Sequence, residues 1–203
     1  MTDPSDRLRD PPETALRSDL RARRRGLRPH DRTVATTAII DRLLGLPELG
    51  PRMGTGRANV GLFSATDGEV DLTSMAPVLR SRGWRTFLPL VGDDRSMTFA
   101  SWTGDDTLVP GRFDISVPAR PTEQVLVGEL DVVVVPCVAV DLAGNRLGFG
   151  AGFYDRALAA RAPSTVLLAP VFDFCVVERI EPRPWDVPVD VVVTEVREHR
   201  PPR

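Results

Sequence analysis

The residues best suited to chemistry lie in one stretch, Gly144–Arg156, which reads GNRLGFGAGFYDR. Within thirteen residues it holds four glycines together with arginine, tyrosine and aspartate. It follows an apolar run (Asp131–Pro136, DVVVVP) that we predict as a buried strand, and it precedes a predicted helix, Phe153–Arg161. A glycine-rich loop that feeds a helix is a place where backbone N–H groups can surround a phosphate. The stretch therefore predicts a phosphate or nucleotide ligand.

Residue types that are missing narrow the chemistry further. The chain has no lysine, which excludes Schiff-base catalysis and a P-loop. Its two histidines, His30 and His199, have no partner at metal-ligand spacing, so we expect neither a zinc site nor a Ser-His-Asp hydrolase. Gly148, Gly150 and Gly152 are spaced GxGxG rather than GxGxxG, which argues against a Rossmann dinucleotide site. Any cation at a phosphate site must be an arginine or a metal ion.

Length, charge and hydropathy bound the class of protein. The 203 residues suit one domain, and the formal net charge of −2 creates no global attraction to nucleic acid or anionic membrane. No apolar run is long enough for a transmembrane helix, and the polar start of the sequence lacks the apolar core of a signal peptide. Cys137 and Cys175 form no CxxC motif, which favours reduced thiols. We expect a cytoplasmic monomer that binds neither nucleic acid nor membrane.

The composition also changes along the chain. We predict a disordered N-terminal tail over residues 1–12, a single domain over 13–196 and a C-terminal tail over 197–203. The segment Arg17–Arg28 is rich in arginine and is interpreted either as the solvated face of a helix or as a helix that faces an anion. A protein that binds RNA through this segment is a further hypothesis, which the overall charge disfavours.

Helical and strand patterns alternate along most of the chain. Apolar periodicity predicts helices over Thr14–Arg25, Asp31–Leu44 and Leu72–Arg82. Residues 45–57 and 103–121 are predicted as irregular because they carry Gly and Pro. The pattern favours an α/β fold with a largely parallel sheet covered on both faces, and ligands of such sheets bind beyond the carboxyl ends of the strands. The predicted strands are Ala58–Phe63, Trp84–Pro89, Met97–Trp102, Asp131–Pro136, Thr165–Ala169 and Val189–Thr194.

GNRLGFGAGFYDRAL closely resembles the GxRLGxGGGYYDRxL signature of the 5-formyltetrahydrofolate cyclo-ligase family, also called methenyltetrahydrofolate synthetases. Four other segments resemble family motifs in the same order: ALRSDLRARRRGL, GEVDLTSM, LDVVVVPCVAVD and WDVPVDVVVTE. The resemblance implies a three-layer αβα fold of the sugar-isomerase and CoA-transferase type. It also implies ATP- and Mg²⁺-dependent closure of 5-formyltetrahydrofolate to 5,10-methenyltetrahydrofolate, with release of ADP and phosphate.

The resemblance further implies a role for each matching residue. Glu69 and Tyr154 would contact the reduced folate, and Asp155 and Asp186 would carry Mg²⁺. The implied catalytic residues are Arg146, Tyr154 and Asp155. The implied ATP-binding residues are Arg17, Arg146, Leu147, Gly148, Phe149, Gly150, Ala151, Gly152, Phe153, Tyr154 and Arg156.

Each of these assignments has a structural alternative that the sequence leaves open. Arg17 could be a solvated helix residue, and Glu69 could cap the helix that follows it. Asp186 could begin a turn into the last strand, and Tyr154 could lie in the core. The glycines could form nothing more than a tight turn.

The chain departs from the family pattern at several positions. The N-terminal lysine of the family falls at Glu13, an acid that would repel ATP unless a neighbouring arginine, Arg9 or Arg21, compensates. Two hypotheses remain. The first is a divergent enzyme with the same activity. The second is a paralogue that binds nucleotide or folate without this activity, or that acts on another formyl or amide substrate. The other main departures are Val117, Cys175 and Trp185.

Overall fold

The computed structural model describes residues 11–51, 58–94 and 96–202. Its central sheet has eight strands in the order β13-β12-β10-β7-β1-β2-β3-β6. Strands β12, β10, β7, β1 and β2 pair in parallel, while β13 on one side and β3 and β6 on the other pair antiparallel. The strands of this sheet are β1 Ala58–Gly61, β2 Trp84–Val91, β3 Met97–Ser101, β6 Gln124–Val125, β7 Val132–Val134, β10 Val166–Pro170, β12 Val191–Val193 and β13 Glu198–His199.

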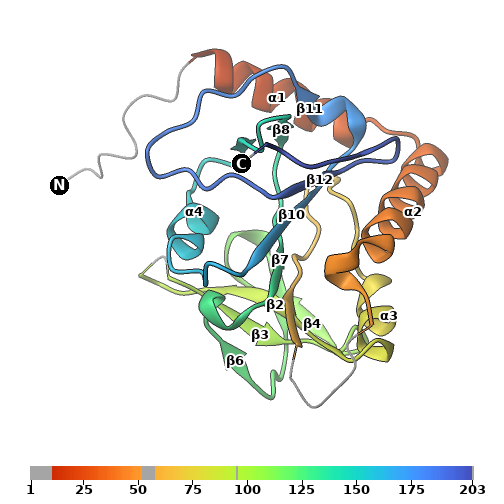
Figure 1. The fold of residues 1–203 in the computed structure, drawn as a ribbon, viewed down its shortest axis with the longest axis vertical. Helices are drawn as coiled ribbons and strands as arrows, with labels where there is room; N and C mark the ends of the chain where they lie inside the picture. Colours follow the sequence, from red (N-terminus) through yellow and green to blue (C-terminus); the bar gives the residue numbers. More distant parts are fainter. Residues whose placement is uncertain (1–10, 52–57, 95, 203) are drawn as a thin grey trace.

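Helices lie on both sides of this sheet (Figure 1). Helices α2 and α3 lie on one side of the central strands, α4 lies on the other, and α1 crosses one end. Short 3-10 turns lie between these elements: η2 Pro47–Leu49, η3 Arg112–Asp114, η4 Val127–Glu129 and η5 Asp173–Cys175. The helices are α1 Pro11–Arg25, α2 Pro29–Gly45, α3 Met75–Ser81 and α4 Phe153–Leu158. The predicted α/β class with a largely parallel sheet is confirmed.

Apolar side chains on both faces explain why the central strands are continuous hydrophobic runs in the sequence. Val132, Val133 and Val134 of β7 are at most 1% exposed. Ile39 and Leu43 of α2 are fully buried against the sheet. A parallel strand needs apolar residues on both faces when helices cover both. Among the described residues, no helix combines the length and the apolar character that crossing a membrane requires.

Two small sheets depart from the predicted pattern. β4 (Leu108–Pro110) and β5 (Ser116–Pro118) form a hairpin within the stretch 103–121 that we predicted as irregular. β8 (Ala139–Asp141), β9 (Arg146–Leu147) and β11 (Val176–Val177) form a three-stranded sheet. Because β9 lies inside Gly144–Arg156, the first part of that stretch is a strand, and the prediction of a single loop there is wrong.

The predicted boundaries differ from the observed ones mainly at the ends of elements. The third helix begins at Met75 rather than Leu72, and the fourth ends at Leu158 rather than Arg161. The stretch 197–203 contains β13, which pairs with β12. The predicted tail ended at residue 12, but α1 already begins at Pro11, so the prediction is wrong for its last two residues. Residues 1–10 of that tail and residues 52–57 of the predicted loop lie outside the described part of the chain.

Candidate functional site

A cleft of about 1040 Å³ opens beyond the carboxyl ends of β1, β2 and β7. Phe63 follows β1, Pro89 lies in the last part of β2 and Pro136 follows β7, and all three line the cleft. Other parts of its wall come from α1, from the glycine stretch and from residues 180–187. Every predicted site residue lines it: Arg17, Glu69, Arg146, Leu147, Gly148, Phe149, Gly150, Ala151, Gly152, Phe153, Tyr154, Asp155, Arg156 and Asp186.

A β-hairpin delivers Arg146 to the cleft. β8 and β9 pair antiparallel, and Asp141 at the end of β8 organises the turn between them. Its Oδ1 accepts hydrogen bonds from the backbone N–H groups of Ala143 (3.0 Å) and Asn145 (2.9 Å). Its Oδ2 accepts one from the backbone N–H of Ile180 at 2.9 Å. One buried carboxylate therefore fixes both the hairpin and the start of the segment 180–187.

Arg146 forms a short ion pair with Asp155 in the wall of the cleft. Its side chain is 3% exposed, and its Nη2 lies 2.6 Å from Oδ1 of Asp155 in the first turn of α4. Its Nε donates to the carbonyl oxygen of Val187 at 3.3 Å. A buried guanidinium needs such a partner because desolvation of an unpaired charge is costly. The pair thus joins the hairpin, α4 and the segment 180–187 at one point of the cleft.

The glycines between β9 and α4 give the loop its shape. Gly152 is the N-cap residue of α4 and has φ +66°, a left-handed conformation that glycine adopts without strain. A Cβ at Gly148 would meet no atom within 4 Å, so this part of the loop faces open space. The carbonyl oxygen of Gly148 accepts a hydrogen bond from Nε of Arg17 at 2.8 Å. Arg17 is therefore fixed against the glycine loop, and the alternative of a solvated helix residue is wrong, since it is 9% exposed.

Aromatic side chains of the loop pack against arginines and another ring. The Phe149 ring lies 5.3 Å from the guanidinium of Arg21 and 5.5 Å from that of Arg24. The Phe153 ring lies 4.9 Å from that of Phe113. Cation–π and tilted ring contacts of this kind restrict the side chains that make them. The loop is consequently attached to α1 at one end and to the segment 112–114 at the other.

Glu69 and Tyr154 bring unpartnered polar atoms to the buried side of the cleft. Glu69 is 7% exposed, and burial raises the pKa of its carboxyl group to about 7. Its Oε2 accepts a hydrogen bond from the backbone N–H of Thr66 at 2.9 Å, while Oε1 has no hydrogen-bond partner. The Tyr154 hydroxyl is also buried without a partner, and burial raises its pKa above the ordinary value. Such atoms are costly unless a ligand satisfies them. Because Glu69 bonds to a residue that precedes it, it does not cap α3.

Asp67, which is not among the predicted site residues, anchors the segment that carries Glu69. Its carboxylate is 2.6 Å from Nε of Arg21, 3.2 Å from Nη2 of Arg24 and 2.6 Å from Nη1 of Arg25. Burial opposes ionisation of Asp67, but the hydrogen bonds and positive charges of Arg21 and Arg25 outweigh it and lower its pKa to about 2. In the sequence, only the cluster of arginines indicated an ion pair here, and it did not indicate that the partner is Asp67, 42 or more residues away.

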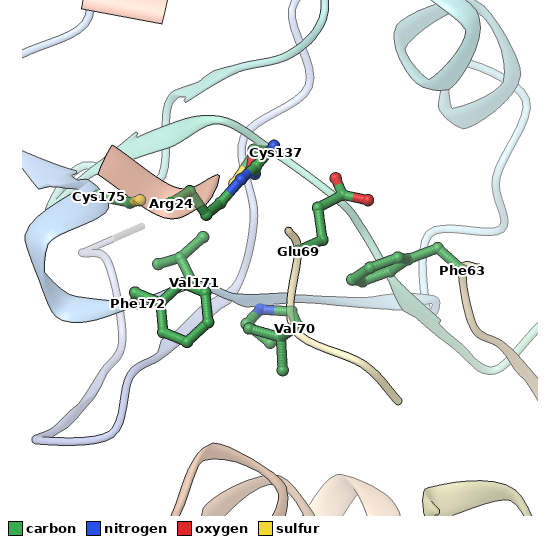
Figure 2. A pocket seen from close by; sticks show the side chains of 9 residues that line it. Arg24, Phe63, Glu69, Val70, Cys137, Val171, Phe172 and Cys175 are labelled. Carbon is green, nitrogen blue, oxygen red and sulfur yellow. The ribbon is translucent and has the colours of Figure 1, made fainter. Parts of the chain in front are cut away.

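A second cavity of about 10 Å³ lies beside Glu69 (Figure 2). Figure 2 shows Glu69 and Phe63 on one side of it and Cys175 and Phe172 on the other. Burial raises the pKa of the Cys175 thiol to about 11, so this cysteine is a buried, unreactive residue. The cavity has the size of a single water molecule and is too small for a substrate.

Besides Cys175, the chain departs from the family pattern at Glu13 and Trp185, which line the cleft, and at Val117, which does not. Glu13 lines it, and its Oε2 is 3.1 Å from Nη2 of Arg183 and 3.6 Å from Nη2 of Arg17. Arg21 pairs with Asp67 instead, so the expectation that it compensates Glu13 is wrong, and Arg9 lies outside the described residues. Trp185 also lines the cleft, with 60% of its surface exposed, whereas Val117 lies in β5 away from the cleft wall.

The carboxylates of the cleft suit a metal ion only in company with phosphate. Asp155 is paired with Arg146, and Oδ2 of Asp186 accepts the backbone N–H of Arg183 at 2.9 Å. Over the described residues, no group of three or more His, Cys, Asp or Glu is placed to hold a metal. Mg²⁺ typically binds one or two carboxylates together with substrate phosphates. Asp155 and Asp186 fit that donor set. Asp186 closes a turn that starts at Arg183, so the alternative that it begins a turn into the last strand is wrong.

Comparison with known proteins decides the family. A family model described as the 5-formyltetrahydrofolate cyclo-ligase family matches residues 10–195. The chain belongs to this family. The 5-formyltetrahydrofolate cyclo-ligase of Escherichia coli K12 is 31% identical over 179 residues, which is 86% of this chain and 96% of that protein. The cyclo-ligase of Haemophilus influenzae is 31% identical over 140 residues, 66% of this chain and 75% of that protein.

A solved structure of the same kind shares the fold. The NMR structure of Aquifex aeolicus 5,10-methenyltetrahydrofolate synthetase superposes with a TM-score of 0.77 and 32% sequence identity, covering 93% of this chain and 92% of that one. The family resemblance stated from the sequence motifs is thus confirmed, and so is the prediction that the chain is an enzyme of this ligase family.

Proposed function

We propose that this chain catalyses the ATP- and Mg²⁺-dependent cyclisation of 5-formyltetrahydrofolate to 5,10-methenyltetrahydrofolate, with release of ADP and phosphate. One observation carries the proposal: the glycine loop, Arg17 and the buried acid Glu69 all line one cleft of about 1040 Å³. A site for a single small ligand typically measures about 300–1,000 Å³. The volume of this cleft lies at the upper end of that range, which is consistent with an organic ligand as large as a nucleotide.

The proposed reaction needs no side-chain nucleophile. The formyl oxygen of the folate attacks the γ-phosphorus of ATP, and the bond to the bridging oxygen breaks to release ADP. N10 then attacks the activated formyl carbon and loses its proton, and phosphate leaves with the electrons of the C–O bond. Phosphoryl transfer of this kind depends on positioning and on neutralised charge.

Each group of the cleft has a task in this reaction. Arg17, Arg146 and Arg156 bring guanidinium groups to the wall of the cleft at the glycine loop, where the chain has no lysine to bind phosphate. Glu69 binds polar N–H groups of the pterin ring, since its unpartnered Oε1 needs a donor. Tyr154 offers its buried hydroxyl to the folate in the same region. Mg²⁺, held by Asp155 and Asp186 with phosphate oxygens, would neutralise phosphate charge.

An absorbance assay tests the proposal directly. Purified protein is mixed with 5-formyltetrahydrofolate, Mg²⁺ and ATP, and the formation of methenyltetrahydrofolate is followed, with an ATP-free control. We expect ATP-dependent product from the wild-type chain and from Arg120→Gln, an exposed residue outside the cleft wall. We expect a large loss with Glu69→Gln. Absence of product from a folded wild-type sample contradicts the proposed activity.

Glu13 favours a second candidate function. An acid in the cleft, where the family motif has a lysine, is suited to a protein that binds nucleotide or folate without turnover. Calorimetric titration with ATP and with 5-formyltetrahydrofolate separates the two candidates. Binding of either ligand with no product in the absorbance assay would support the non-catalytic function and contradict the first.

A further inference from the structure

Arg183 is a cationic residue of the cleft that is not among the predicted site residues. It lies in the segment 180–187 and lines the cleft beside Pro184 and Trp185. Its Nη2 atom is 3.1 Å from Oε2 of Glu13. The same carboxylate oxygen is 3.6 Å from Nη2 of Arg17. One carboxylate is therefore shared by two guanidinium groups that come from opposite ends of the chain.

The charges of these three residues decide whether this wall attracts a polyanion. Glu13 and Arg17 alone would be neutral as a pair, and Arg183 gives the group a net positive charge. Arg17 is hydrogen-bonded to the carbonyl oxygen of Gly148, so this positive charge lies next to the glycine loop. Positive charge on the wall of a cleft strengthens the binding of anions because field lines concentrate there. Arg183 thus restores the net positive charge that Glu13 would otherwise cancel at this wall of the cleft.

The backbone around Arg183 is held in place from two sides. Its N–H donates to Oδ2 of Asp186 at 2.9 Å, and the N–H of Asp186 donates back to the carbonyl oxygen of Arg183 at 3.0 Å. One residue beyond Asp186, the carbonyl oxygen of Val187 accepts Nε of Arg146 at 3.3 Å. The turn that carries Arg183 is consequently tied to the same hairpin that leads into the glycine loop.

We propose that Arg183 is a phosphate-binding residue for the nucleotide in the cleft, and that Glu13 is the positioning residue that holds it toward Arg17. The inference rests on the proposed function in taking ATP as the anion. The guanidinium group suits this role because its planar N–H donors match two phosphate oxygens at once. The Arg183 side chain is 36% exposed, so it is accessible to a ligand while paired with Glu13.

Steady-state kinetics of three variants test the proposal. Arg183→Gln removes the charge, and we expect the KM for ATP to rise about tenfold, as for loss of a charge-assisted hydrogen bond, with kcat and the KM for folate unchanged. Arg120→Gln removes an exposed charge outside the cleft wall and should leave all three constants at wild-type values. Adding Glu13→Lys to Arg183→Gln places a cation at position 13, and we expect it to recover most of the affinity for ATP.

Calorimetry separates this inference from the proposed function. Binding of a non-hydrolysable ATP analogue with Mg²⁺ is measured for wild type and Arg183→Gln, without folate. Weaker binding by the variant supports the role of Arg183 even if no methenyltetrahydrofolate is formed. Equal binding by both proteins overturns it, as does failure of the wild type to bind the analogue. A raised KM for folate with an unchanged KM for ATP also overturns it, because Arg183 would then bind the glutamate carboxylates of the folate.

Discussion

Glu69→Gln should make the protein more stable at alkaline pH while it abolishes activity. The wild-type carboxyl group is 7% exposed and has one oxygen without a hydrogen-bond partner. Ionising it in the folded state leaves a buried charge that only the unfolded state can solvate. The glutamine side chain of the variant has nearly the same size and can still accept the backbone N–H of Thr66, but it never becomes charged.

The size and sign of the effect follow from the pKa of Glu69. Burial raises it from 4.5 to about 7, so the folded state binds more protons than the unfolded state between these values. The free energy of unfolding therefore falls as the pH rises through this window, by about 3 kcal/mol at about 1.4 kcal/mol per pKa unit. The glutamine variant lacks this loss. Relative to wild type it should gain up to about 3 kcal/mol above pH 7, or roughly 6–12 °C in melting temperature for a chain of this size.

Urea denaturation of both proteins at pH values from 5 to 8.5 measures this difference. The other titrating groups are common to both chains, so the difference between their unfolding free energies isolates Glu69. We expect a small difference at pH 5, a gap that widens up to about pH 7, and a nearly constant gap above it. Parallel curves over the whole range would show that the Glu69 carboxylate is solvated or paired in solution, and the reasoning from its burial would then be wrong.

Three further predictions concern groups around the cleft. Asp155→Asn leaves the buried Arg146 guanidinium without its anion, and we expect loss of turnover in the absorbance assay and about 2–3 kcal/mol of unfolding free energy in urea; wild-type turnover would disprove the role of Asp155. Asp67→Asn removes the partner of three α1 arginines and should cost about 1–2 kcal/mol at neutral pH. The pKa of Asp67 is lowered from 3.8 to about 2 in the folded state, so the extra stability of the wild type is complete above pH 4 and disappears as the pH falls through 2. Equal stabilities of the two proteins at pH 7 would contradict the stabilising role of Asp67. Gly152→Ala should cost about 1–2 kcal/mol because of its left-handed φ of +66°, whereas Gly148→Ala, with open space beside it, should unfold at the same urea concentration as wild type; equal losses in the two alanine variants would refute this distinction.

The sequence predicted the parallel core well because its physical signal is local. A strand buried on both faces must be apolar at every position, and β7 and β10 satisfy this with runs of Val and Leu. The candidate site residues were brought together by motif resemblance, and all of them line one cleft. The periodicity of the chain alone would not have placed Arg17 next to Gly148, 131 residues away.

The elements that were missed carry no period to detect. β9 and β11 have two residues each, and β8 has three, so alternation cannot distinguish them from loops. Their formation depends on pairing between distant segments, as between Val176 and Val140. The same limit applies to ion pairs. The arginines of α1 were open to two interpretations, a solvated helix face or a helix that faces an anion, and their partner Asp67 could be identified only from the folded chain.

The fluorescence of Trp185, which lies exposed in the wall of the cleft, should report on whether the cleft is occupied. Trp84 and Trp102 are 2% and 4% exposed, and their emission is expected to report on the core, whereas Trp185 is 60% exposed beside Arg183 and Asp186. These three are all the tryptophans of the chain. Ligand binding in the cleft should therefore shift the emission of Trp185 to shorter wavelength and protect it from a soluble quencher, so that binding can be followed without a label. The variant Trp185→Phe, which keeps only the two buried tryptophans, should show neither change.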